Sequence, residues 1–209
     1  MNRAWGISAD GSTAVGDGFP NNREAFRWNA AEGLLRMGDL PGGGQIESRA
    51  FAVSADGSII VGYGVSDLGW EPFRWDATNG MQGLGVFGDF PGFNTARGVS
   101  ADGSIVVGEA QTAFGLKAFI WDAANGLQEL EVILADLGVD LTGWSLTSAS
   151  GVSADGRTVV GKGINPSGVS EAWIAVLDDP APVPVLGPIG FSILLGLVGA
   201  MTSWRVGGV

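Results

Sequence analysis

Histidine and cysteine are both absent from this chain of 209 residues, and each absence removes a class of chemistry. Without cysteine there is no disulfide framework, no thiol nucleophile and no thiolate metal site. Without histidine the commonest general base and the commonest metal ligand are missing, which excludes zinc sites and Ser-His-Asp hydrolysis. Carboxylates, lysine, tyrosine and hard cations bound by oxygen atoms are the chemistry that remains.

Charge is also scarce, because only 16% of the residues are charged, and 22 acidic residues outnumber 11 basic ones. The resulting net charge of −11 repels phosphate backbones, so no nucleic-acid partner is expected. Glycine, in contrast, is abundant, with 36 residues. Each glycine inside a helix costs about 0.5–1 kcal/mol relative to alanine, so this composition favours many short strands joined by tight turns.

The sequence Ser-Ala-Asp-Gly occurs four times, and its aspartates are separated by 46, 46 and 53 residues. A second marker, of the type Glu-Ala-Phe-Arg-Trp, follows each copy at a nearly constant distance. Glycine accepts a positive φ and aspartate bonds to its own backbone, so each copy is predicted to be a structural hairpin turn. The turn residues are Asp10, Gly11, Asp56, Gly57, Asp102, Gly103, Asp155 and Gly156.

Each unit reads as four short strands, which predicts an all-β fold of β-propeller type with units 4–49, 50–95, 96–148 and 149–177. A β-solenoid is the alternative. The aromatic residues of the second marker are expected to pack between blades: Phe26, Trp28, Phe73, Trp75, Phe119, Trp121 and Trp173. Arg27 and Arg74, which alternate with them, indicate that the other face of the strand is in contact with solvent.

The fourth unit is preceded by an insertion and ends early, so the propeller is expected to be incomplete or open. The seven extra residues fall between Leu130 and Ala149, where 131–137 is the only stretch of helical character and Trp144 is expected to plug the join. The fourth unit lacks its last strand. No signal peptide precedes the first unit, and we therefore expect the N-terminus to be incomplete.

The composition changes after the repeat domain, which is assigned to residues 1–178. Residues 179–184 form a proline-rich linker, 185–204 an apolar segment and 205–209 a short tail. Twenty helical residues span about 30 Å, the thickness of a bilayer core, so the segment is predicted to be a transmembrane or sorting helix. A helix that docks on the repeats is the alternative.

The units Gly-Val-Ser-Ala-Asp-Gly-Ser-Ile-Val-Val-Gly (98–108) and Glu-Ala-Phe-Arg-Trp (24–28) resemble those of the HAF-type bacterial extracellular repeat family. The C-terminal segment resembles a sorting signal of the PEP-CTERM or IPTL type, although Pro-Glu-Pro itself is absent. Its motif residues are Pro184, Leu186, Pro188 and Arg205. The resemblance implies export to the cell envelope or beyond it, and processing by a sortase-like enzyme.

The residues that could form a functional site each have a structural interpretation as well. The four Asp-Gly turns could bind calcium, but each supplies a single carboxylate where Ca²⁺ takes six to eight oxygens. Glu24, Glu71 and Glu171 recur at one repeat position and are interpreted as solvated strand residues. A nucleophilic role for Tyr63 and sugar stacking by Trp70 or Trp144 are minor alternatives. No catalytic, cofactor-binding or metal-binding residue is therefore predicted.

The sequence favours a non-enzymatic protein, exported or held at the cell surface, that serves as a structural or interaction module. Its expected partners are the membrane through the C-terminal helix, a sortase-like enzyme, and an extracellular polysaccharide or protein. A carbohydrate- or calcium-binding propeller is the first alternative, and a propeller glycoside hydrolase or lyase is the second.

Overall fold

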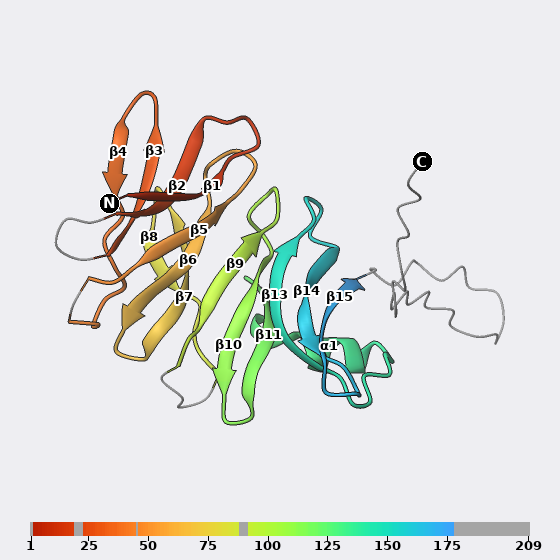
Figure 1. Cartoon of the computed structure of the whole chain (residues 1–209). Helices are drawn as coiled ribbons and strands as arrows, with labels where there is room; N and C mark the ends of the chain where they lie inside the picture. The colour runs from red at the N-terminus through yellow and green to blue at the C-terminus, as the bar shows by residue number, and fades with distance from the viewer. Residues whose placement is uncertain (1, 19–22, 45, 88–91, 178–209) are drawn as a thin grey trace, which may run out of the picture.

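Four antiparallel β-sheets follow one another along an arc in the computed structural model, which describes residues 2–18, 23–44, 46–87 and 92–177 (Figure 1). Blade 1 contains β1 (Arg3–Ile7), β2 (Thr13–Gly18), β3 (Glu24–Asn29) and β4 (Gly33–Arg36). Blade 2 contains β5 (Arg49–Val53), β6 (Ile60–Ser66), β7 (Gly69–Asp76) and β8 (Gly80–Gly83). Blade 3 contains β9 (Thr95–Val99), β10 (Val106–Thr112), β11 (Gly115–Asp122) and β12 (Gly126–Glu129). Blade 4 contains β13 (Ser145–Val152), β14 (Thr158–Ile164) and β15 (Ser170–Val176).

The blades are arranged as in a β-propeller. Strands within each blade pair in chain order, and the first strands β1, β5, β9 and β13 lie side by side from blade to blade. Blades 1 and 4 stand at opposite ends of the arc in Figure 1, so the ring does not close within the described residues. The all-β, propeller-like prediction is confirmed, and the fourth sheet has three strands in the described part of the chain.

The Ser-Ala-Asp-Gly turns join the first two strands of every blade by the same hydrogen bonds. In blade 2, the Ser54 hydroxyl donates to Asp56 Oδ1 at 2.7 Å and accepts the Ile59 N–H at 2.9 Å. Asp56 Oδ1 also accepts the Ser58 N–H at 3.0 Å, and Gly57 has a φ of 76°. The other three turns repeat this pattern, with φ values of 72°, 73° and 76° at their glycines.

The alanines of these turns connect the blades through their backbones. The Ala9 N–H donates to the Ala55 carbonyl at 3.1 Å, Ala55 to Ala101 at 3.0 Å, and Ala101 to Ala154 at 3.0 Å. The ladder has a direction, because each blade donates to the blade that follows it. It holds consecutive units in one register without any contribution from side chains.

The hydrophobic core lies between consecutive blades. Phe73 and Phe119 are fully buried, and the equivalent Phe26 and Trp173 are 6% exposed. Trp75 and Trp121 pack against the same clusters, whereas Trp28 on blade 1 is 43% exposed. The predicted packing between blades therefore fits Phe73, Trp75, Phe119, Trp121 and Trp173. Phe26 and Trp28 lie on the face of blade 1 that has no preceding blade in the described chain.

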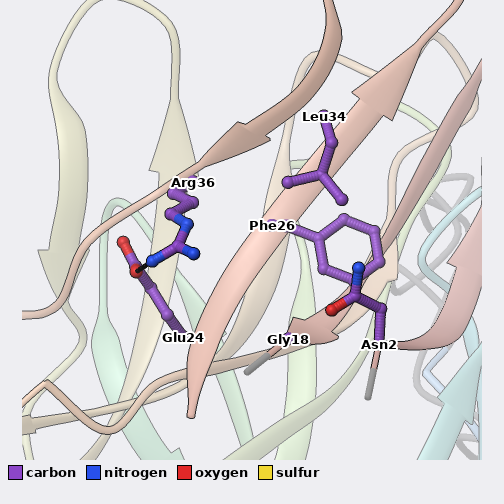
Figure 2. Close-up of a pocket in the computed structure, with 6 residues that line it drawn as sticks. All are labelled: Asn2, Gly18, Glu24, Phe26, Leu34 and Arg36. Carbon is purple, nitrogen blue, oxygen red and sulfur yellow. Dashed lines mark hydrogen bonds and ion pairs between the residues drawn. The ribbon is translucent and has the colours of Figure 1, made fainter. Parts of the chain in front are cut away.

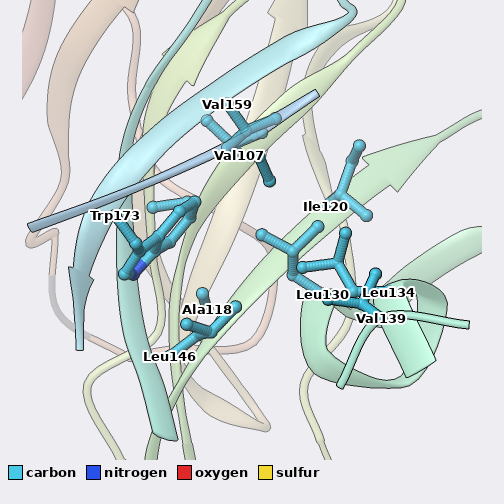
Figure 3. Packing of buried hydrophobic residues seen from close by; sticks show 11 residues of the cluster. Val107, Ala118, Ile120, Leu130, Leu134, Val139, Leu146, Val159 and Trp173 are labelled. Atoms are coloured by element: carbon cyan, nitrogen blue, oxygen red, sulfur yellow. The ribbon is translucent and has the colours of Figure 1, made fainter. Parts of the chain in front are cut away.

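The insertion before blade 4 forms helix α1 (Leu130–Asp136) and extends the last core cluster (Figure 3). Leu130 and Leu134 of α1 pack with Ile120 of blade 3, and Trp144 is half-buried against the same cluster. The helical prediction for this stretch is confirmed with a shift of one residue. The insertion thus fills space beside blades 3 and 4 instead of forming a free loop.

The expectation that Arg27 and Arg74 face solvent is wrong. The Arg27 guanidinium lies 5.2 Å from the centre of the Trp75 ring on the next blade, and Arg74 Nε donates to the Gly103 carbonyl at 3.5 Å. In blade 3 the same position is Ile120, which is 7% exposed. The aliphatic part of arginine packs between blades while its charged end reaches a ring or a carbonyl, so an alternating arginine does not identify a solvated face.

The predicted C-terminal segments lie outside the described residues. They are the linker, the sorting helix with its motif residues Pro184, Leu186, Pro188 and Arg205, and the tail. Among the residues that are described, no helix has the length and apolar character needed to cross a membrane.

Candidate functional site

The first strand of every blade carries a β-bulge at the same repeat position. In β1, Ala4 pairs with Gly16 and Gly6 with Val15, which leaves Trp5 as the extra residue. The same register shift occurs at Phe51 in β5, Arg97 in β9 and Ser150 in β13. A bulge changes the direction in which the side chain of the extra residue points. The first strands of the four blades therefore present four different side chains in the same local geometry.

Five aromatic rings form a continuous strip across blades 1 to 3, which we call the aromatic strip: Trp5, Phe51, Tyr63, Trp70 and Phe93. Neighbouring ring centres are 4.0–6.1 Å apart, and Tyr63 and Trp70 stack with an angle of 2° between their planes. Phe93 is 61% exposed and Trp5 47% exposed, so the two ends of the strip are its most accessible parts.

Two arginines hold the strip in place. The Arg49 guanidinium lies 5.3 Å from the Trp5 ring centre and 5.4 Å from that of Phe51, and Arg97 lies 4.8 Å from Phe51. A guanidinium over an aromatic face contributes about 0.5–2 kcal/mol, so the rings are fixed before any ligand arrives. Arg97 also forms an ion pair of 2.6 Å with Glu109.

A buried carboxylate, Asp17, lies beneath the strip. Its side chain has no exposed surface and accepts a hydrogen bond from Trp5 Nε1. Arg49 Nε lies 3.2 Å from Asp17 Oδ1, and Arg23 Nε lies 3.8 Å from Oδ2. Arg23 in turn donates to the Tyr63 hydroxyl at 3.2 Å and to Glu47 at 3.0 Å. Asp17 therefore connects Trp5 of blade 1 with Arg49 of blade 2.

The four turn aspartates are already engaged within their own turns. Hydrogen bonds from the Ser54 hydroxyl and from Ser58 lower the pKa of Asp56 from 3.8 to about 2. The equivalent bonds from Ser100 and Ser104 lower the pKa of Asp102 to about 2. Since each carboxylate belongs to a separate blade and serves its own hairpin, the geometry supports a structural role for these residues.

The sequence predicted that the recurrent glutamates are solvated strand residues, and for Glu24 and Glu71 this prediction is wrong. Glu71 is 7% exposed and accepts the Gly85 N–H at 2.9 Å. Glu24 accepts the Gly38 N–H at 3.1 Å in the same way. Both carboxylates hold the segment that follows the fourth strand of their blade. In blade 3, Lys117 occupies this position and donates to Glu131 at 2.7 Å.

The sequence singled out Trp70 but missed most of the strip. Tyr63, for which the sequence offered a nucleophilic role as an alternative, lies in β6 and is 3% exposed. Trp144 packs in the insertion before blade 4 and is not part of the strip. Trp5, Phe51 and Arg97 share one signal, because each stands three residues before the serine of its turn. Their convergence with Phe93 could not be inferred without the stacking of the blades.

No family model matches this chain, and no curated protein matches it. Solved structures do resemble it. TolB from Acinetobacter baumannii is 21% identical over 83% of this chain and 40% of its own, with a TM-score of 0.53. Putative TolB from Agrobacterium tumefaciens is 15% identical over 87% of this chain and 63% of its own, with a TM-score of 0.56.

A puromycin hydrolase mutant (S511A) in complex with PGG is 19% identical over 83% of this chain and 26% of its own, with a TM-score of 0.53. The chain thus spans less than two thirds of each of these proteins. At such identities the likeness extends to the fold alone. The chain has the β-propeller fold seen in the TolB structures.

Proposed function

We propose that this chain is a non-enzymatic interaction module, and that its aromatic strip binds an extracellular polysaccharide. The observation that carries the proposal is the strip itself: rings from blade 1, blade 2 and the segment before β9 form one continuous row, which has exposed ends and two arginines packed on it. Binding through a partly exposed aromatic surface needs no reacting group, which agrees with a chain that lacks histidine and cysteine.

Sugar rings suit this surface for a physical reason. One face of a pyranose carries mainly C–H groups and packs on a flat aromatic ring, while its hydroxyl groups need polar partners at the edge. Phe93 and Trp5 offer exposed rings at the two ends, and Arg97, with a side chain 39% exposed, offers hydrogen-bond donors between them. Two separated stacking positions suit a sugar polymer better than a single sugar.

The carboxylates near the strip support binding instead of hydrolysis. Glycosidases use two carboxyl groups, one as an acid and one as a base or nucleophile, about 5–9.5 Å apart. Here Asp17 is fully buried and paired with Arg49 and Arg23, and Glu109 is paired with Arg97. Neither is placed to donate or accept a proton at the surface of the strip.

Export to the cell surface is part of the same proposal and rests on the resemblance of the repeats and of the C-terminal segment. In a cell-fractionation experiment, we expect the full chain to be associated with the envelope. A variant that ends at residue 179 should be recovered in the soluble fraction. If the full chain is soluble and uncleaved, the assignment of the C-terminal segment is wrong.

Affinity electrophoresis of the full chain in gels that contain neutral glucans, mannans or uronic-acid polymers would test binding. We expect at least one polymer to retard the protein, and Phe93→Ala to weaken binding by about tenfold, because it removes one of the two exposed rings on which a sugar can stack. Phe114→Ala is the matched control, since Phe114 is 92% exposed in the β10–β11 turn and takes part in none of the ring contacts that form the strip.

If none of the polymers retards the protein, the polysaccharide proposal is rejected. Retention that Phe93→Ala leaves unchanged would mean that the strip is not the binding surface. Release of shortened sugars from a bound polymer, lost on substitution of an acidic residue, would show that the protein is an enzyme.

A further inference from the structure

The last blade exposes the surface that the other three bury. Val15, Val61 and Val107 occupy one position in the second strand of blades 1 to 3, and each is completely buried under the next blade. Val160 occupies that position in blade 4 and is 41% exposed. Its neighbours on the same face, Ile174 and Val176, are 37% and 44% exposed. This face has the packing residues of an inter-blade contact, but no blade covers them within the described residues.

The first blade exposes the complementary surface. Ala50, Ala96 and Ala149 in the first strands of blades 2 to 4 are completely buried against the preceding blade, whereas the equivalent Ala4 is exposed. A hollow opens on this side of blade 1 (Figure 2), and it is lined by Asn2, Gly18, Glu24, Phe26, Leu34 and Arg36. The rings equivalent to Phe26 are covered by the preceding blade in the interior of the arc.

Two further features stop at the ends of the arc. Within the described residues, the alanine ladder begins with the Ala9 carbonyl, which has no donor blade before it, and ends with the Ala154 N–H, which has no acceptor blade after it. A Cβ added at Gly57, Gly103 or Gly156 would lie less than 3.0 Å from a side chain of the preceding blade. No described atom lies within 4 Å of the same point at Gly11.

We propose that these two ends bind each other in separate copies of the chain, so that blade 4 of one copy packs head to tail on blade 1 of the next. The ends are complementary to each other and not to themselves, because one carries the donor side and the other the acceptor side of the same inter-blade contact. The occupant is therefore a second copy of this chain. This inference does not depend on the proposed polysaccharide site.

Head-to-tail contacts close into a ring when the rotation allows and otherwise continue as an open assembly. Propellers contain about four to eight blades, so two copies of a four-bladed chain reach the upper end of that range. A closed dimer would have two identical joins. It would also complete the alanine ladder, with the Ala154 N–H of each copy opposite the Ala9 carbonyl of the other.

One position makes the join weaker than the internal contacts. Asp17 of blade 1 faces Arg49 at the start of blade 2, at 3.2 Å. Lys162 takes the place of Asp17 on blade 4, and Arg3 takes the place of Arg49 on blade 1, so two like charges would meet at the join. We therefore expect a dissociation constant in the micromolar range. This constant should fall when salt is added, since salt screens like-charge repulsion.

Sedimentation equilibrium of the full chain over a range of concentrations would test the proposal. We expect the mass to rise from 21.4 kDa toward at least twice that value. Val160→Asp and Trp28→Asp each place a charge on one end and should weaken self-association by at least about tenfold. A mixture of the two variants should associate again, because each retains the end that the other has lost. Phe114→Asp, on a hairpin between the ends, is the control.

Lys162→Asp should strengthen association roughly threefold to tenfold by giving Arg3 of the second copy an opposite charge. A chain that is monomeric at every concentration overturns the proposal. Association that persists in both Val160→Asp and Trp28→Asp also overturns it, because the contact would then lie elsewhere. Failure of the mixed variants to associate would reject the head-to-tail arrangement.

Discussion

The backbone N–H of Ala55 donates a 3.0 Å hydrogen bond to the carbonyl oxygen of Ala101, one repeat period later in the chain. Both alanines stand at the second position of a Ser-Ala-Asp-Gly turn, so the turn that closes each hairpin also fixes the next blade. This dual role explains why the residues of the turn recur so strictly while the outer strands vary. The stability of the turns is therefore expected to depend on neighbouring blades as well as on local geometry.

The glycine of the turn allows the local and the inter-blade contributions to be separated. Gly11 and Gly103 have nearly the same φ, 72° and 73°, but only Gly103 packs closely on a residue of the preceding blade, Ile59. Gly103→Ala should lower the free energy of unfolding by about 2–4 kcal/mol through backbone strain and overpacking. Gly11→Ala should cost only the strain, about 1–2 kcal/mol.

Urea denaturation of both variants would measure the difference. Equal losses would show that the inter-blade contact at Gly103 contributes nothing. A Gly103→Ala variant as stable as the parent would contradict the turn geometry itself.

Stability should fall in acid because of the turn aspartates. The pKa of Asp56 and that of Asp102 are about 2 in the folded chain, below the ordinary value of 3.8. A carboxyl whose folded pKa is lowered stabilises the fold above its unfolded pKa, and this stabilisation is lost as the pH falls through the folded pKa. We therefore expect the loss between about pH 4 and pH 2.

Denaturation curves at pH 7, 4, 3 and 2 would measure this effect. The double variant Asp56→Asn and Asp102→Asn should be less stable than the parent at pH 7, and the gap should narrow toward pH 2. A gap that stays constant with pH would mean that the ionised carboxylates are not the stabilising species.

Among the charged residues near the aromatic strip, Asp17 is expected to contribute most to stability. Asp17→Ala removes the carboxylate that faces Arg49 and the acceptor of Trp5 Nε1, while Arg23 keeps its ion pair with Glu47. Loss of one partner from a buried ion pair costs about 3–5 kcal/mol, and partial exposure of the two arginines reduces the expected cost to about 2–4 kcal/mol.

Thermal unfolding followed by tryptophan fluorescence would measure the change in stability. Glu32→Ala is a suitable control, because Glu32 pairs with Arg27 at 2.7 Å but its side chain is 48% exposed. An Asp17→Ala variant no less stable than Glu32→Ala would show that the network under the strip is not stabilising.

Aromatic residues at equivalent positions should differ in their contribution according to the blade. Phe119 is fully buried between blades 2 and 3, and Phe119→Ala should cost about 3–5 kcal/mol. Trp28 is 43% exposed at the end of the arc, and Trp28→Ala should cost less than about 1.5 kcal/mol in the monomer. Chemical denaturation at a low protein concentration avoids any contribution from association, and comparable losses would mean that blade 1 is covered in the monomer.

The repeat could be read from the sequence because its determinants are local. Asp10 and Gly11 supply the side-chain oxygen and the positive φ that a tight turn requires, and this chemistry acts within five residues. The apolar runs that follow each turn predict strands for the same reason. The environment of a charged residue could not be read in this way, because Arg27 packs on Trp75 of the next blade and Glu71 is covered by the segment that follows the fourth strand of its own blade.

The amino-acid sequence by itself determined the period, the hairpins and the all-β class, since turn geometry and strand alternation depend on neighbouring residues in the chain. Only the tertiary structure decided which side chains meet. Trp5 of blade 1, Phe51 of blade 2 and Phe93 of the segment before β9 lie far apart in the chain and become one surface because the first strands bulge and the blades stack. The exposed face around Val160 likewise depends on its place in the arc, because the equivalent valines of blades 1 to 3 are buried by the blade that follows each of them.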